Sequence, residues 1–207
     1  MFHLIGQIVR IVKERTEAGY LPYQLSDIRM AITNITNIDR IEVISVPAGD
    51  LDVVGRYSRY EMQIAPYAAY EAVVKIEYSD ILNDCWRRYV ICKELCQALV
   101  HYPSAAVDNE EKLIQLCDEL RSNQLNENVI KLAEPAFSEL IANIAAQEIL
   151  CPLDDRRMIL ARREAGEHID DMEIAQAFRL PLAKIANLFE SSYIDLVAHL
   201  LDSEQDG

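Results

Sequence analysis

Two segments of the chain carry residues whose types and spacing could bind a cation. In the first segment, Glu94 lies between Lys93 and Gln97, which are one helical turn apart. His101 follows one turn later on the same helix face, and the second segment contains a further acid, Glu139. Carboxylate and imidazole groups are metal ligands, and a carboxylate beside an ammonium group forms an ion pair. The chemistry in question is therefore the binding of a positive charge.

The spacing of apolar residues predicts the elements that must position these side chains. Helical periodicity predicts nine helices, of which the second runs from a cap at Ser26 or Asp27 to Ile35. The other eight are predicted at residues 3–19, 84–101, 108–122, 127–150, 156–165, 172–178, 182–189 and 191–201. Pro135 is a potential break in the helix at 127–150, and Asp170 and Asp171 are predicted to cap the helix at 172–178. Alternating, β-branched stretches predict strands at residues 40–47, 56–64 and 72–78, the last as an edge or half-buried strand. The predicted fold class is α+β, with a small antiparallel or mixed sheet and a helix-rich body.

The two segments resemble the ImmA/IrrE family of zinc metallopeptidases. That family has a helix of the form R-x-x-x-A-H-E-L-G-H-A-L and a later helix of the form E-x-x-A-N-x-F-A-A-x-L-L-x-P. The scaffold letters that match are Leu95, Ala98, Leu99, Ala142, Asn143, Ala146, Leu150 and Pro152. The resemblance runs from about Val73 to Pro152, and loosely on to Phe189. It implies a zincin-like core over residues 1–152 and a helical, helix-turn-helix-like extension over residues 153–207 packed on that core.

The resemblance also implies a role for each site residue. The two histidine ligands of the family fall on Lys93 and Gln97, the general-base Glu on Glu94, and the third ligand on Glu139. A Lys amine binds metal only after it loses a proton, which costs roughly 4–5 kcal/mol at neutral pH. A Gln carbonyl is a weak ligand for zinc. We therefore expect no metal and no cofactor, and we expect Lys93 to replace the metal electrostatically, paired with Glu139 and also with Glu94.

Other interpretations of these residues remain open. Lys93 and Glu94 could simply face solvent. Glu94, Gln97, His101 and Glu139 could form a weak metal site, or His101 could stabilise the negative end of its helix dipole. Arg88 falls where the family often has an arginine, but it could equally belong to a solvated helix start.

Three other groups of side chains have types and spacing that could indicate a function. The five cysteines are odd in number and lack a C-x-x-C pair, so they predict buried thiols in a reducing compartment, although Cys92 and Cys96 share a helix face. The basic cluster Arg156, Arg157, Arg162 and Arg163 is expected to pair with the acidic stretch 108–119, or else to bind an anionic partner. The tyrosines Tyr57, Tyr60, Tyr67, Tyr70 and Tyr78 suit a half-buried sheet face, with a partner surface as the alternative.

Composition limits the classes of function. The 207 residues carry 20 basic and 34 acidic side chains, a net charge of −14, and 51% are hydrophobic. This balance predicts a globular, cytoplasmic protein without a membrane span, and it disfavours nucleic-acid binding. Residues 171–189 have the rhythm of a helix-turn-helix, but its second helix offers only Lys184 and Asn187 to a base edge, so a packing module is the alternative.

Three functions follow from these observations. The first is a catalytically inactive relative of the peptidases that binds a protein, such as a transcriptional regulator, in a phage, mobile-element or stress context. The second is an active metal-dependent hydrolase with an altered metal site that includes Glu94 and Glu139. The third is a DNA-binding regulator that acts through residues 171–189.

Overall fold

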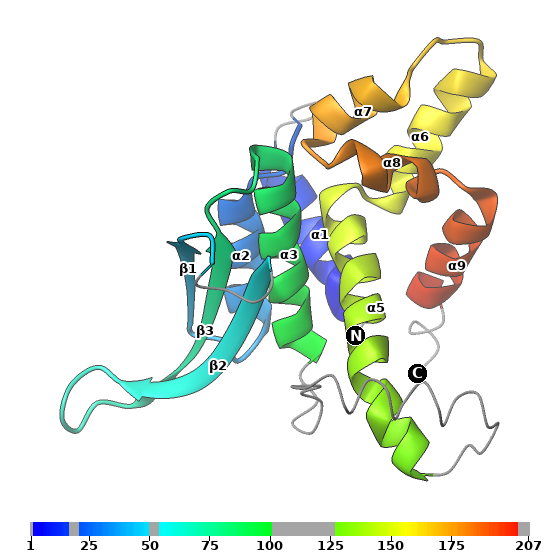
Figure 1. Ribbon diagram of the computed structural model, residues 1–207. Helices are drawn as coiled ribbons and strands as arrows, with labels where there is room; N and C mark the ends of the chain where they lie inside the picture. The colour runs from blue at the N-terminus through cyan, green and yellow to red at the C-terminus, as the bar shows by residue number, and fades with distance from the viewer. Residues whose placement is uncertain (1, 17–20, 50–53, 101–126, 203–207) are drawn as a thin grey trace.

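The computed structural model describes residues 2–16, 21–49, 54–100 and 127–202, and of residues 127–137 it describes the backbone alone. Within these residues the chain is α+β, as predicted, with eight helices and one three-stranded sheet (Figure 1). The helices are α1 (Phe2–Arg15), α2 (Leu25–Ile35), α3 (Asp84–Val100), α5 (Glu127–Leu150), α6 (Leu153–Glu164), α7 (Asp171–Phe178), α8 (Leu182–Leu188) and α9 (Ser191–Asp202). The strands are β1 (Arg40–Val46), β2 (Gly55–Gln63) and β3 (Tyr70–Ser79). The predicted helix at residues 108–122 lies outside the described residues.

The sheet has the order β1-β3-β2, so of the two alternatives predicted for the third strand, the edge strand is wrong and the half-buried strand agrees with the structure. β3 pairs in parallel with β1 and antiparallel with β2. Its alternation reflects two different faces. Val74 and Ile76 are fully buried in the core, whereas Glu77 forms ion pairs with Lys75 and with Arg56 of β2. The polar positions thus mark the outer face of a central strand.

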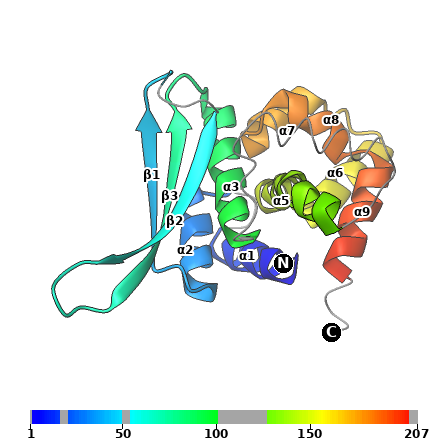
Figure 2. The ribbon, with the colours of Figure 1, turned by 60° about the horizontal axis from the view of Figure 1, so that its bottom comes forward.

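The helices form layers on one side of the sheet (Figures 1 and 2). α2 and α3 lie against the sheet, α1 and α5 lie behind them, and α6 to α9 form the outermost group. α1 shows why the sequence folds in this way, because its apolar residues recur at helical spacing. Ile5, Ile8 and Val12 are all buried against the neighbouring helices.

The β2–β3 hairpin projects beyond the helices (Figures 1 and 2). This projection separates the tyrosines into two groups. Tyr57 and Tyr78 pack against the core, as a half-buried sheet face requires. Tyr60, Tyr67 and Tyr70 are exposed, with 102% relative exposure at Tyr67.

The observed starts of α2 and α6 differ from the predicted starts by a few residues, and the predicted break in α5 is absent. α2 begins at Leu25 after Gln24, without a side-chain cap, so Ser26 and Asp27 lie inside its first turn. α6 begins at Leu153, directly after Pro152, and α5 continues through Pro135 without a break. The predicted cap of α7 is confirmed at Asp170, which accepts a hydrogen bond from the backbone N–H of Glu173 in a capping box.

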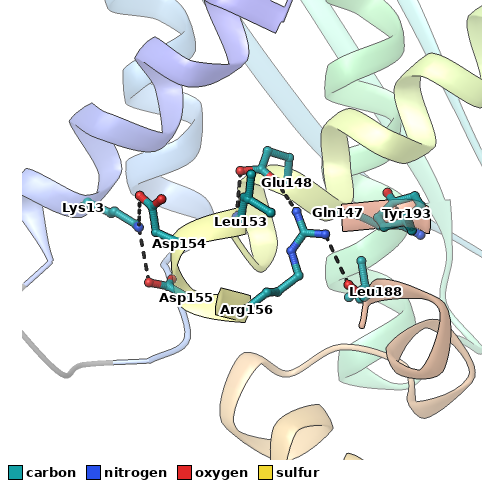
Figure 3. Close-up of polar contacts among 9 residues, drawn as sticks. All are labelled: Lys13, Gln147, Glu148, Leu153, Asp154, Asp155, Arg156, Leu188 and Tyr193. Atoms are coloured by element: carbon teal, nitrogen blue, oxygen red, sulfur yellow. Dashed lines mark hydrogen bonds and ion pairs between the residues drawn. The ribbon is translucent and has the colours of Figure 1, made fainter. Parts of the chain in front are cut away.

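A buried ion pair connects the outermost helices to α5 (Figure 3). The Arg156 guanidinium donates to the Glu148 carboxylate, and its side chain is fully buried. Glu148 also accepts from the backbone N–H of Leu153 at 2.9 Å, which holds the start of α6. Arg156 further donates to the Leu188 carbonyl at the end of α8 and lies 5.6 Å from the ring centroid of Tyr193 in α9.

Candidate functional site

The packing of α3 against α5 brings the four predicted site residues together. The ammonium nitrogen of Lys93 lies 2.8 Å from Glu94 Oε1 and 2.8 Å from Glu139 Oε1. Gln97 donates to the other oxygen of the same carboxylate, Glu139 Oε2, at 2.9 Å. Two side chains one turn apart on α3 therefore contact both oxygens of one carboxylate on α5. The predicted pairing of Lys93 with both acids is present, and the alternative in which Lys93 and Glu94 face solvent is wrong.

Burial decides the electrostatics of this cluster. Glu94 is 2% exposed, whereas the side chains of Lys93 and Glu139 are 15% and 43% exposed, so the cluster opens to solvent on the Glu139 side. Burial raises the pKa of Glu94 above its ordinary value, although the Lys93 charge opposes this shift. Burial alone would lower the pKa of Lys93, but the Glu94 charge and the hydrogen bonds to both acids outweigh it and raise that pKa. Lys93 therefore keeps its proton.

Two side chains that the sequence did not identify as functional complete the cluster. Asn143 donates to the backbone carbonyl of Glu139 at 2.8 Å and to Glu139 Oε1 at 3.3 Å. Tyr89 donates to Asn143 Oδ1 at 2.6 Å, and burial raises its pKa well above the ordinary value. Their helical spacing was the available signal, because Tyr89 lies one turn before Lys93 and Asn143 one turn after Glu139. They hold the Glu139 carboxylate toward α3.

Gly55 sets the distance between the sheet edge and the cluster. A Cβ atom at this position would lie 2.3 Å from Val90 Cγ1 and 3.5 Å from Glu94 Oε1. Any residue with a side chain would therefore push β2 away from α3. The close approach of β2 also buries Tyr57 near Glu94, and burial together with the Glu94 charge raises the pKa of Tyr57.

The residues of the cluster do not fit a zinc ion. At the two positions where the family resemblance would place imidazole ligands, the side chains are a protonated amine and an amide. The Lys93 ammonium already lies within contact distance of both carboxylates, so a metal cation would meet a like charge there. Among the described residues, no group of three or more His, Cys, Asp or Glu side chains could hold a metal ion. His101, the additional ligand of the predicted weak site, lies outside the described residues.

The other predicted side chains fall in structural positions. Arg88 is buried and donates to the backbone carbonyl of Tyr23, so it is not part of a solvated helix start. Arg87 is exposed and pairs with Asp84 at 2.5 Å. Cys92 and Cys96 are fully buried, which fits the packing interpretation. Cys117 lies outside the described residues.

Three of the four arginines of the basic cluster form ion pairs within the described residues, with acids that the sequence did not indicate, and Arg157 is exposed. Arg162 pairs with Glu167 at 2.6 Å and Arg163 with Asp171 at 2.8 Å, in addition to the buried pair of Arg156. The stretch 108–119, which was the predicted partner, lies outside the described residues.

The second helix of the helix-turn-helix-like segment packs against the core. The Lys184 ammonium lies 4.9 Å from the ring centroid of Tyr89 and 6.0 Å from that of Trp86, both on α3. Asn187 is exposed. One of the two side chains available for reading a base is therefore engaged by α3.

Comparison with known proteins does not assign the chain to a family. No protein-family model matches it, and a search of curated proteins gave no match either. None of the described helices has the length and apolar character needed to cross a membrane. The similarity to zinc metallopeptidases therefore rests on the residues quoted above.

Proposed function

We propose that this protein is a catalytically inactive, metallopeptidase-like module that acts by binding a protein partner. The observation that carries the proposal is the shared carboxylate of Glu139, which is contacted by Lys93 and Gln97 from one helix turn. In a metallopeptidase of the type that the sequence resembles, those two positions and that carboxylate converge on zinc. Here an ammonium group supplies the positive charge instead.

Energetics favour a structural role for this ammonium group. A buried carboxylate without a cation is costly, and removing one partner of a buried pair commonly costs about 3–5 kcal/mol. The Lys93 charge offsets the burial of Glu94 without requiring a metal. The same charge leaves no ligand position at which a water molecule could be activated as a nucleophile. The replacement of a metal ion by the Lys93 ammonium group therefore maintains the fold and removes the capacity to catalyse hydrolysis.

The β2–β3 hairpin is the surface that we propose for the partner. Ile64, Tyr67 and Tyr70 are exposed near its tip. Exposed aromatic and aliphatic side chains that are grouped in this way are typical of protein interfaces. The net charge of −14 favours a partner with a basic surface over an acidic one.

The proposal is tested by restoring the two histidines. Lys93→His combined with Gln97→His should create a three-ligand site with Glu139, because the two positions already converge on its carboxylate. We expect one zinc ion per chain and at least a hundredfold gain in zinc affinity over the unmodified protein, measured by competition with a chromophoric chelator. Zinc should also raise the melting temperature of the double variant.

A matched control adds Glu139→Gln to the double variant. It should lose most of the gained zinc affinity, because the third ligand becomes a neutral amide. A double variant that folds, as judged by circular dichroism, and gains no zinc binding would contradict the proposed relationship. Stoichiometric zinc or manganese in the unmodified protein would instead favour the second candidate, a hydrolase with an altered metal site.

A further inference from the structure

A cavity of about 770 Å³ lies between α1, α6 and α7. None of Lys93, Glu94, Gln97 and Glu139 lines it. Its volume lies within the range of roughly 300–1,000 Å³ that is typical of small-molecule sites. The cavity is therefore large enough for a ligand and separate from the cluster of the proposed function.

The floor of the cavity is apolar. It is formed by Ile159, Ile174 and Phe178, which are all buried, together with the ring of Tyr23. The Tyr23 hydroxyl donates to Asp155 at 2.6 Å, so its polar end is already satisfied. A ligand with an apolar body could replace water here without leaving a polar group unpaired.

The charged groups around the cavity decide whether it favours a cationic or an anionic ligand. The basic side chains that line it, among the described residues, are Lys13, Arg162 and His168. Lys13 lies 3.2 Å from Asp155 and Arg162 lies 2.6 Å from Glu167, so these two cations are engaged by acids. A third acid, Glu173, is exposed at the rim. Its carboxylate accepts a hydrogen bond from the backbone N–H of Asp170 at 3.0 Å and takes part in no ion pair among the described residues. With histidine counted as neutral, as in the net charge of the chain, the described lining residues carry three acids and two cations.

We propose that this cavity binds a small amphipathic amine, with its apolar body on the floor and its ammonium group at the rim beside Glu173. An organic cation is attracted by the Glu173 carboxylate, which no cation neutralises among the described residues, and the rings of Tyr23 and Phe178 favour it further. An organic anion would find Lys13 and Arg162 already paired with acids. This inference does not depend on the proposed function.

A matched set of three ligands tests the sign of the charge. 4-Phenylbutylamine, 4-phenylbutanol and 4-phenylbutyrate share one apolar body and differ in the charge of the end group. We expect the amine to bind saturably at one site, the alcohol several-fold more weakly, and the carboxylate at least tenfold more weakly than the amine. Isothermal titration calorimetry at low and at physiological salt measures all three.

Variants of the cavity wall locate the binding site. Ala177 is an exposed residue of α7 that lines the cavity, so Ala177→Trp should fill it and weaken amine binding at least tenfold. Ala161→Trp is the control, because Ala161 is exposed on α6 and does not line the cavity. If Ala177→Trp fails to fold, Met158→Trp fills the same cavity from α6. Glu173→Gln should weaken the amine several-fold and leave the alcohol unchanged.

The expected result is saturable amine binding that is lost in the filled variant and kept in the control. Three outcomes would overturn the inference. They are no saturable binding of the amine, carboxylate binding as tight as amine binding, and unchanged amine affinity in a folded Ala177→Trp or Met158→Trp variant.

Discussion

Lys93 is the residue on which the electrostatics of the cluster depend. It lies 2.8 Å from each of two carboxylates, one of which, Glu94, is almost completely buried. Glu94 has no other cation within contact distance among the described residues. The charge of Lys93 is therefore the main reason why an acid can be buried beneath the edge of the sheet.

Replacing this lysine should destabilise the protein in a pH-dependent way. Lys93→Met should lower the free energy of unfolding by about 3 kcal/mol at pH 7, because Glu94 is left buried and unpaired. The pKa of Glu94, already above its ordinary value of 4.5, should rise further. Between pH 4.5 and this raised pKa, Glu94 is protonated in the folded variant and ionised in the unfolded chain. The loss in free energy of unfolding, relative to the unmodified protein, should therefore be small near pH 4.5 and grow as the pH rises.

Urea unfolding from pH 4.5 to pH 8 measures this effect. The control is Lys75→Met, because Lys75 pairs with Glu77 on the outer face of the sheet and its side chain is 30% exposed. That variant should cost at most about 1 kcal/mol. Equal losses in the two variants, or a Lys93→Met deficit that does not change with pH, would contradict a buried role for the lysine charge.

At the scale of elements, the contact between β2 and α3 depends on the missing side chain of Gly55. Val90 is buried and β-branched, so its Cγ1 atom cannot easily move away from an added Cβ atom 2.3 Å distant. The start of β2 can therefore lie this close to α3, the helix that carries Lys93 and Glu94, because residue 55 has no side chain.

Gly55→Ala should therefore destabilise the fold by about 1–3 kcal/mol through overpacking. The double variant with Val90→Ala should lose at least about 1 kcal/mol less than the sum of the two single variants, since the clashing atom is gone. Chemical denaturation of the four proteins measures the coupling. Gly6→Ala is the control, because nothing lies within 4 Å of the added Cβ in α1 and alanine favours a helix, so it should be neutral or stabilising.

At the scale of the whole molecule, Arg156 joins the outermost helices to one another and to α5. Its contacts reach α5 through Glu148, α8 through Leu188 and α9 through Tyr193. Residues 153–207 were predicted as an extension packed on the core, and this ion pair is one of the contacts between the described part of that segment and α5. Such a connection should couple the unfolding of both parts.

Arg156→Met should lower the free energy of unfolding by about 3–5 kcal/mol, because Glu148 stays buried without its partner. Adding Glu148→Gln should recover at least about 1 kcal/mol, since the amide oxygen can still accept from the backbone N–H of Leu153.

Trp86, the only tryptophan of the chain, lies beside Lys184 of α8 and reports on the docking of that helix. In the unmodified protein, unfolding followed by Trp86 fluorescence and by far-ultraviolet circular dichroism should coincide, whereas two separate transitions would indicate independent domains.

The sequence by itself determined the elements and the composition of the candidate site. Apolar spacing predicted the described helices and strands to within a few residues, because amphipathic periodicity is a local property. The placement of Lys93 against Glu94 and Glu139 was predicted through the family resemblance, which put the three residues at one site, and through the cost of burying two carboxylates without a cation. The order of the strands was not predictable in this way, because the alternation in β3 is equally compatible with an edge and with a centre.

Only the tertiary structure decided which distant groups meet. The contacts of Arg156 with Leu188 and Tyr193, the hydrogen bond from Tyr89 to Asn143, the contact of Gly55 with Val90 and the cavity between α1, α6 and α7 all join residues that are far apart in the sequence. Their formation depends on how the helices and strands pack, and local residue patterns carry little information about such packing. This is why the residues of the cluster could be named from the sequence, whereas the contacts that hold the cluster in place could not.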